Sequence, residues 1–343
     1  MAAVRLQDVA ARAGVSQATA SRVLNGSARV PGEGVADRVR AAARELGYVP
    51  NAQAQALARS STGLLGLVVH DIADPYFSSI ARGVQSAART ARKQVLLAGT
   101  DRDFDIEREA VATFIAHRAD AIVLAGSRQS GDLDRELEAE FGRYRENGGR
   151  VVVIGQPLAF GGAVEPENYF ASRELAYALV DAGHTEFAVI GGPGSIRTAV
   201  DRRNGFVEAL GRRGLTPLVE VSGAFTRDGG HSAALRLAAA LQIQPGAGTK
   251  PVCVFAVTDV MAIGAIAAWR ELGLSVPGDL CVAGFDDIPT LRDHTPSLTT
   301  VVLPLEEIGA RAAELALCAS DSDADLRERV PGRVVLRDST RLD

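Results

Sequence analysis

The chain opens with VRLQDVAARAGVSQATASRVLNGS, residues 4–27, a stretch that predicts two short helices around a glycine. Apolar residues recur at helical spacing from Leu6 onward, and Gly14 can adopt the left-handed conformation that a tight turn needs. Ser16 is a natural N-cap for the second helix. Residues 34–46 predict a third helix, which would close the core of a small all-α head.

The second helix carries a polar face that suits the major groove of DNA. We expect DNA contacts from the residues on or beside this face: Ser16, Gln17, Ala18, Thr19, Ser21, Arg22 and Asn25. Gln17 and Arg22 have donors and acceptors that read base edges, and Ala18 can touch a thymine methyl group. The serine and threonine hydroxyls can bind phosphates. The alternative is an ordinary helical hairpin, although the face lacks the Glu/Lys pairs of a merely solvated helix.

Charge is divided unevenly along the 343 residues. Residues 1–60 contain eight arginines and four acidic residues, a net charge of +4, whereas the whole chain carries −5 and the remainder therefore −9. Phosphate attraction depends on local charge, so this division predicts that only the head meets nucleic acid. The alternative is a chance fluctuation of surface charge.

Composition limits where the protein works and what it binds. The longest apolar runs, such as residues 64–69, are far shorter than the ~20 residues of a membrane helix. The N-terminus has no uninterrupted apolar segment of the kind a secretory signal needs, so we expect a cytoplasmic protein without membrane association. The three cysteines have no paired spacing and fit reduced thiols, and the five histidines have no metal-ligand spacing. We expect no metal and no cofactor.

After Ser60 the pattern changes to strands that alternate with helices, which predicts parallel sheets. The predicted strands are residues 64–69, 95–98, 121–124, 151–154, 187–190, 218–221, 252–257 and 280–283. The predicted helices between them are residues 77–92, 106–118, 132–147, 169–182, 199–214, 229–242 and 259–273. The number of strands and a glycine-rich junction near Gly161 favour two sheets rather than one.

Three segments resemble the lactose/galactose-repressor (LacI) family of bacterial transcription regulators: LQDVAARAGVSQATASRVLNGS (6–27), ELGYVPNAQAQALARSSTGLLGLVV (45–69) and GFDDIPTLRDHTPSLTTVVLPLEEIGARA (284–312). The resemblance implies an α/β body of periplasmic-binding-protein type, with two lobes and parallel sheets, behind the helix-turn-helix head. The expected divisions are 1–49 for the head, 50–60 for a hinge helix, 61–160 with 290–320 for the N-terminal lobe, and 161–289 with 321–343 for the C-terminal lobe.

The segment NAQAQALAR, residues 51–59, is rich in alanine but shorter than the ~12–15 residues that an isolated helix needs. The resemblance implies that it becomes a hinge helix when two subunits dock it in the minor groove, with Leu57 wedged into the central base step. Asn51, Ala54 and Arg59 would lie along the same groove. The alternative is a flexible linker, which needs neither the alanines nor the leucine.

Ligands of open α/β sheets bind beyond the carboxyl ends of the strands. Among residues near those ends, the resemblance implies effector contacts from Tyr76, Phe77, Arg197, Arg202, Phe225, Thr258 and Asp286. Carboxylate and guanidinium groups bind adjacent hydroxyls in pairs and aromatic rings stack on sugars, so the set suits a small polar ring, sugar-like. The alternatives are that Asp286 caps a turn and that Tyr76 or Phe77 belongs to the core. Thr258 stands where many family members carry asparagine, which changes the hydrogen bonds around a ligand.

Other classes of function fit less well. The segment GGPGS, residues 191–195, lacks both the Gly-x-Gly-x-x-Gly and the Gly-Lys-Ser/Thr patterns, and no Gly-x-Ser-x-Gly elbow is present, so we expect no enzyme. A transport-type binding protein would need export and no DNA-binding head. We expect a repressor that binds a palindromic operator as a homodimer, under control of an effector held between the lobes. The chain after Leu317 has no leucine heptads, which favours a dimer over a zipper-linked tetramer.

Overall fold

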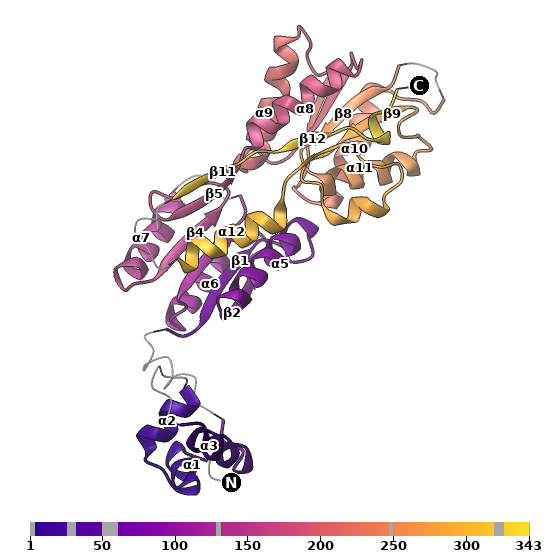
Figure 1. The fold of residues 1–343 in the computed structure, drawn as a ribbon. Helices are drawn as coiled ribbons and strands as arrows, with labels where there is room; N and C mark the ends of the chain where they lie inside the picture. Colours follow the sequence, from indigo (N-terminus) through magenta and orange to yellow (C-terminus); the bar gives the residue numbers. More distant parts are fainter. Residues whose placement is uncertain are drawn as a thin grey trace. The chain divides into compact units, whose positions relative to one another are not determined.

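The computed structural model describes residues 4–25, 32–49, 61–127, 132–246, 250–318 and 326–342. The chain divides into two compact units, Met1–Gly63 and Leu64–Asp343, each of which has its own core (Figure 1). The predicted hinge segment, residues 50–60, lies outside the described residues.

The first unit is a three-helix head: α1 (Leu6–Ala13), α2 (Gln17–Asn25) and α3 (Glu33–Glu45). Gly14 ends α1 with a φ of 66°, the left-handed conformation that the sequence predicts. The Ser16 Oγ accepts the Thr19 backbone N–H at 3.1 Å, so the predicted N-cap is confirmed. The apolar stripes of the three helices meet in one core, formed by Val9, Ala10, Ala13, Ala20, Val23, Ala36, Val39, Ala42 and Ala43.

The first lobe of the second unit is built on a six-stranded parallel sheet with the order β11-β5-β4-β3-β1-β2. Its strands are β1 (Leu64–Val69), β2 (Gln94–Gly99), β3 (Ala121–Ala125), β4 (Arg150–Ile154), β5 (Gly162–Pro166) and β11 (Arg327–Val330). Its helices are α5 (Pro75–Thr90), α6 (Phe104–Ala116), α7 (Asp132–Glu146) and α12 (Leu305–Leu317). Although far apart in sequence, α5 and α12 lie side by side (Figure 1).

The second lobe is built on a four-stranded parallel sheet with the order β7-β6-β8-β9. Its strands are β6 (Phe187–Gly191), β7 (Val219–Ser222), β8 (Val252–Ala256) and β9 (Leu280–Ala283). Its helices are α8 (Asn168–Asp181), α9 (Arg197–Arg212), α10 (Arg227–Leu241) and α11 (Asp259–Glu271). Two short 3-10 helices, η1 (Pro289–Asp293) and η3 (Asp338–Thr340), follow β9 and β12.

A two-stranded antiparallel ribbon, β10 (Thr300–Val302) with β12 (Arg333–Val335), runs beside the second lobe. Single bridges join it to the end of β9, from Ala283 to Thr299 and from Asp286 to Val302. Within the described residues the chain passes between the lobes from β5 to α8, from β10 to α12 and from β11 to β12. The ribbon therefore connects the second lobe directly to α12 of the first.

The strand pairing corrects the expected lobe boundaries at three places. The sequence assigned residues 162–166 and 327–330 to the C-terminal lobe, but β5 pairs with β4 and β11 pairs with β5 in the first sheet. Residues 300–302, assigned to the N-terminal lobe, pair with β12 beside the second lobe. These strands have only three to five residues, and their partners lie far away in sequence, so their composition does not show which sheet they join.

Every predicted strand and helix of the body is present, with ends shifted by two residues at most. The helices α5, α6 and α10 begin two residues earlier than predicted, because Asp74, Asp103 and Thr226 cap them with side-chain hydrogen bonds to backbone N–H groups. Strands β5, β10 and β11 and helix α12 were not predicted.

Two glycines allow α5 and α12 to touch. A Cβ on Gly83 would lie 1.9 Å from the Glu306 carbonyl oxygen, and a Cβ on Gly309 would lie 2.1 Å from the Ile80 carbonyl oxygen. The two helices therefore approach until backbone meets backbone. This packing joins the chain that returns from the second lobe to the beginning of the first.

Gly83→Ala is expected to lower the free energy of unfolding of the body by about 1–3 kcal/mol, because the added methyl group must separate α5 from α12. Urea denaturation followed by circular dichroism measures the change. The matched control is Gly142→Ala in α7, where a Cβ has no neighbour within 4 Å, and which is expected to stabilise by about 0.5–1 kcal/mol. Equal changes in both variants would contradict the close packing.

Candidate functional site

The head presents the predicted recognition face to the outside. Gln17, Ala18 and Arg22 are exposed on α2, while Ala20 and Val23 of the same helix are buried in the head core. Ser16 is also exposed, and Thr19 and Ser21 are half-buried; Ser16 and Thr19 hydroxyls lie 2.8 Å apart. The Asn25 side chain lies outside the described residues, as do Asn51, Ala54, Leu57 and Arg59.

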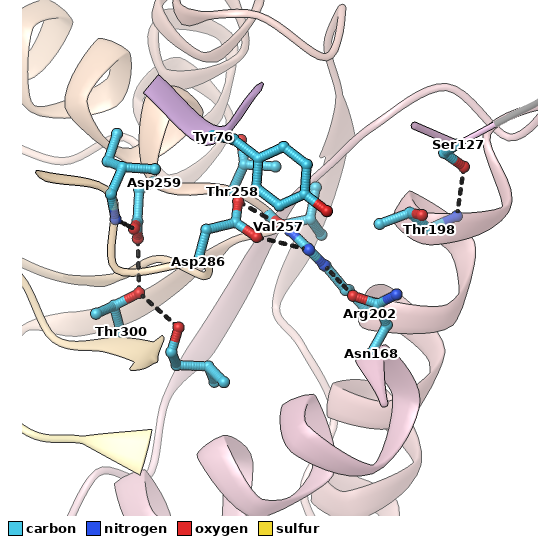
Figure 2. A network of polar contacts seen from close by, with 12 residues as sticks. Tyr76, Ser127, Asn168, Thr198, Arg202, Val257, Thr258, Asp259, Asp286 and Thr300 are labelled. Atoms are coloured by element: carbon cyan, nitrogen blue, oxygen red, sulfur yellow. Dashed lines mark hydrogen bonds and ion pairs between the residues drawn. The ribbon is translucent and has the colours of Figure 1, made fainter. Parts of the chain in front are cut away.

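The body holds a buried ion pair at the carboxyl end of the second sheet. The Arg202 Nη2 donates to Asp286 Oδ1 at 2.7 Å and its Nη1 donates to Oδ2 at 3.2 Å, a two-pronged contact with both side chains nearly inaccessible to water (Figure 2). The same guanidinium donates to the Val257 carbonyl at 2.9 Å and to Asn168 Oδ1 at 2.8 Å. Phe285 lies beneath it, with the ring centroid 3.8 Å from Cζ. Arg202 is therefore fixed in one orientation.

The turn that carries Asp286 is strained and is held from several sides. Asp286 and Asp287 both have positive φ, 117° and 55°, a conformation that costs energy for residues other than glycine. The Asp286 N–H donates to the Val301 carbonyl at 2.9 Å, which ties the turn to β10. Arg337, from the C-terminal segment, donates to Asp287 Oδ1 at 2.7 Å. These contacts fix where the Asp286 carboxylate points.

Asp259 also stabilises the turn that carries Asp286. This fully buried side chain accepts the Ile288 backbone N–H at 3.0 Å and the Thr300 hydroxyl at 2.7 Å. A Cβ on Gly284 would lie 2.2 Å from Asp259 Oδ1, so only glycine fits above it. Thr258, one of the predicted effector contacts, is buried and caps α11 by accepting the Met261 N–H at 3.3 Å.

Burial governs the protonation of these carboxyl groups. It raises the pKa of Asp286 to about 6, against the opposing effect of the Arg202 charge. Burial and the neighbouring Asp286 raise the pKa of Asp259 to about 7. The pKa of the Tyr76 hydroxyl is also raised, by removal from water and by Asp286, so this group stays a hydrogen-bond donor at neutral pH.

The first lobe reaches this region through Tyr76 and Ser127. Tyr76 lies at the start of α5 with its ring beside Asp286 and Arg202 (Figure 2). Ser127, after β3, accepts the Thr198 backbone N–H of α9 at 3.1 Å, a hydrogen bond between the lobes. The Gln156 amide donates to the same hydroxyl oxygen at 3.2 Å. Side chains from both lobes therefore converge on one polar network.

Phe225 joins the two lobes in a second place. The ring lies against Gly192, where a Cβ would approach Phe225 Cδ2 to 2.7 Å, so the GGPGS segment makes room for an aromatic side chain. From the first lobe, the Arg102 guanidinium lies over this ring, with Cζ 5.5 Å from the centroid.

Two predicted effector residues do not join the network. Phe77 is buried in the core, in edge-on contact with His70 and Tyr76, which is the alternative role that the sequence left open. Arg197 is exposed and its Nε donates to Asp201 Oδ1 at 2.8 Å, one turn along the same helix. Because α9 turns about 100° per residue, its neighbour Thr198 faces the first lobe instead.

Four residues of the network were not among the predicted site residues: Ser127, Asn168, Arg102 and Asp259. All four follow the carboxyl end of a strand or open the next helix. That position is a usable sequence signal, but it applies equally to many polar residues, and only the tertiary contacts separate them.

Neither a metal site nor a membrane span is found in the part of the chain that the structure describes. No group of three or more His, Cys, Asp or Glu side chains there is arranged to hold a metal ion. No described helix is both long and apolar enough to cross a bilayer.

Comparisons with known proteins agree with both units. The sequence profile of bacterial regulatory proteins of the lacI family matches residues 5–51, and that of periplasmic binding protein-like domains matches residues 176–340. The HTH-type transcriptional regulator GalS of Salmonella typhimurium is 33% identical over 327 residues, which cover 94% of this chain and 92% of GalS.

Solved structures show the same fold over nearly the whole length. The lac repressor dimer bound to operator and the anti-inducer ONPF matches with a TM-score of 0.84 and 25% identity, covering 99% of this chain and 100% of that one. A complex of the transcriptional regulator CelR with cellobiose matches with a TM-score of 0.68 and 28% identity, covering 98% and 99%.

A helix-turn-helix head joined to a two-lobed, ligand-binding type of body defines a transcription regulator controlled by a small molecule. The chain belongs to the lacI family of bacterial regulatory proteins. The family resemblance of the sequence and the predicted α/β body with parallel sheets are thereby confirmed.

The pKa of Asp259 predicts how stability depends on pH. Its folded-state pKa of about 7 lies above the ordinary value of 3.8, so between these values the folded state binds a proton that the unfolded state lacks. The free energy of unfolding should therefore rise as pH falls from 8 to 5, by roughly 2–3 kcal/mol from this group.

Urea denaturation at both pH values tests this prediction, with Asp259→Asn as the comparison. The variant keeps an acceptor for the Ile288 N–H. Other groups whose pKa is shifted by burial, such as His184 and Asp286, are present in both proteins and contribute equally to the pH dependence. If the variant shows the same pH dependence as the natural chain, Asp259 does not titrate as inferred.

Proposed function

We propose that this chain is a repressor that binds a palindromic operator as a homodimer, with an operator affinity set by a small polar effector, sugar-like, held between the two lobes. The observation that carries the DNA-binding half is the exposed face of Gln17, Ala18 and Arg22 on a helix whose other face is buried. Such a face fits a major groove and carries groups that read base edges. The solved lac repressor, a dimer bound to operator, is consistent with the same arrangement here.

The hinge contacts remain part of the proposal. Asn51, Ala54, Leu57 and Arg59 would lie in the minor groove between two recognition helices, as the family resemblance implies. Because the operator is cytoplasmic DNA, we place the working protein in the cytoplasm and assign it no enzymatic activity. The curated relatives are transcriptional regulators, which supports that assignment.

The effector half rests on the Arg202–Asp286 pair and the residues around it. Tyr76, Phe225 and Thr258 are the other predicted contacts that lie at the same edge of the sheets, whereas Phe77 and Arg197 are left out of the proposed site. The two groups of the pair bind each other and are only 2% and 4% exposed, so ring hydroxyls would bind to their remaining lone pairs and donor once a ligand enters between the lobes. Tyr76 offers a ring face and a donor beside the pair. CelR, a relative in structure, forms a complex with cellobiose.

Control of operator affinity requires that the effector bind one arrangement of the lobes better than another. The hydrogen bond from Thr198 to Ser127 and the Arg102–Phe225 contact both cross between lobes, so a ligand that alters their spacing would bias the lobe arrangement. The β10 ribbon, which holds Asp286 and leads into α12, offers a route by which that bias reaches the first lobe.

Arg22→Ala is expected to lower specific operator affinity by about 1–3 kcal/mol, roughly 5- to 150-fold, and to relax base preference at one position of each half-site. The operator is found first, by retaining genomic fragments on the protein near physiological salt and sequencing them. Arg40→Ala is the matched control, because it removes the same charge from an exposed site on α3, beside Asp37. An equal, sequence-independent loss in both variants would argue against α2 as the reading helix.

Asp286→Ala is expected to leave operator binding within a few-fold while abolishing its response to effector, because the head does not contain this residue. Protein bound to labelled operator is challenged with a panel of pentoses, hexoses and their acidic derivatives, and fluorescence anisotropy follows binding. The sign of the response shows whether the effector induces or co-represses. A variant that responds as the natural chain does would place the effector elsewhere.

A further inference from the structure

The loop after β2 contains two consecutive residues in a conformation that side chains disfavour. Asp101 and Arg102 have φ values of 49° and 63°. The loop is fixed on both sides, because the Asp101 N–H donates to the His70 carbonyl at 2.7 Å and the Asp103 N–H donates to the Thr100 carbonyl at 2.7 Å. Left-handed residues other than glycine cost energy and concentrate at binding sites, so the conformation of this loop points to a function for Arg102.

Arg102 points across to the other lobe. Its guanidinium lies over the ring of Phe225, one of the residues expected to contact the effector. The contact distance of 5.5 Å is that of a cation–π interaction, which orients a guanidinium plane over a ring and leaves its N–H edge open. Arg102 is half-buried, and this burial lowers the pKa of its guanidinium.

The Arg102 guanidinium has no direct polar partner in the part of the chain that the structure describes. Within the described residues, no acceptor lies within hydrogen-bond distance of its guanidinium and no carboxylate lies within ion-pair distance. Three carboxylates, Asp74, Asp71 and Asp101, attract it only at longer range. Asp74 and Asp71 each accept a backbone N–H of their own loop, from Tyr76 and Ala73. Arg202 differs from Arg102 in this respect, because its N–H groups donate to Asp286, Val257 and Asn168.

Arg202 is therefore held in a two-pronged ion pair, whereas Arg102 has only the longer-range attraction of Asp74, Asp71 and Asp101. A partly desolvated guanidinium that meets no acceptor among the described residues can bind a planar or tetrahedral oxyanion through two parallel hydrogen bonds. A neutral hydroxyl would accept one bond and leave the guanidinium without a directly bonded counter-ion.

We propose that Arg102, seated on Phe225, is a subsite for an oxyanion of the effector, so that the effector is an acidic sugar derivative and not a neutral sugar. The inference rests on the proposed effector site and names its ligand class. The ring of the ligand would lie at Arg202, Asp286 and Tyr76, and its carboxylate or phosphate would lie at Arg102.

The first test uses inorganic phosphate as the probe and the full chain as the sample. Thermal unfolding is measured from 0 to about 50 mM phosphate, with chloride added to keep ionic strength constant. The melting temperature of the body is expected to rise by about 2 °C in the natural chain and not in Arg102→Met. Arg92→Met is the matched control, because Arg92 is also left-handed, with a φ of 55°, but lies exposed at the end of α5. This control should respond as the natural chain does.

Equal phosphate responses in Arg102→Met and the natural chain, or no response in the natural chain, would overturn the subsite. Neither result depends on operator binding, so the subsite can fail while the proposed repressor function stands. The converse also holds, because a chain without a palindromic operator could still bind phosphate at Arg102.

The second test separates carboxylate from phosphate. Calorimetric titration compares each neutral sugar with its acid and its phosphate: glucose, glucuronate and glucose 6-phosphate; galactose, galacturonate and galactose 6-phosphate; ribose and ribose 5-phosphate. In the series that binds, the acid or the phosphate is expected to bind at least about tenfold tighter than the neutral sugar, and Arg102→Met should remove that advantage. A neutral sugar that binds as tightly, or an advantage that survives in Arg102→Met, would refute the proposal. If no compound of any series binds, the sugar-like effector is refuted, and the phosphate response alone decides the subsite.

Discussion

The buried pair of Arg202 and Asp286 constrains the body more than any other interaction. Removing two charges from water costs several kcal/mol per ion unless each finds a partner with good geometry, and here every oxygen of Asp286 and most donors of Arg202 are used. The pair joins α9 to the turn after β9. Asn168 accepts a hydrogen bond from Arg202 and so ties the pair to the beginning of α8, where the chain enters the second lobe. The strained φ angles of Asp286 and Asp287 are sustained because β10, Asp259 and Arg337 hold the turn that the pair requires.

The same constraint connects the proposed effector-binding edge with the rest of the body. Asp286 is bonded to Val301, the middle residue of β10, and three residues after this strand the chain begins α12. There, Gly83 and Gly309 let α12 and α5 meet backbone to backbone, so a movement of one helix displaces the other. Tyr76 is the second residue of α5 and lies beside Asp286. A continuous series of contacts therefore runs from the ion pair through β10 and α12 to α5, and from Tyr76 back to the ion pair.

The sequence predicted most of the secondary structure because its signals were local. Alternating apolar runs and helical patterns located each predicted strand and helix of the body to within two residues. The errors at the starts of α5, α6 and α10 come from caps whose hydrogen bonds define the first turn. It did not show β5, β10 or β11, which have five, three and four residues and are stabilised by pairing with strands elsewhere in the chain. The assignment of β5 and β11 to the wrong lobe has the same origin, since parallel strands pair with segments remote in the chain.

For the candidate site, the sequence by itself determined which residue types follow the strand ends and that a helix-turn-helix head precedes them. The head is decided locally, because Gly14, Ser16 and the apolar stripes act within a few residues of one another. Only the tertiary structure decided that Arg202 meets Asp286, 84 residues away, that Ser127 and not Arg197 contributes to the contact between lobes, and that Arg102 faces Phe225. The physical reason is that a charged or hydrogen-bonding group needs a particular partner only once folding has removed both from water. The spacing of residues along the sequence does not show which groups will be buried together.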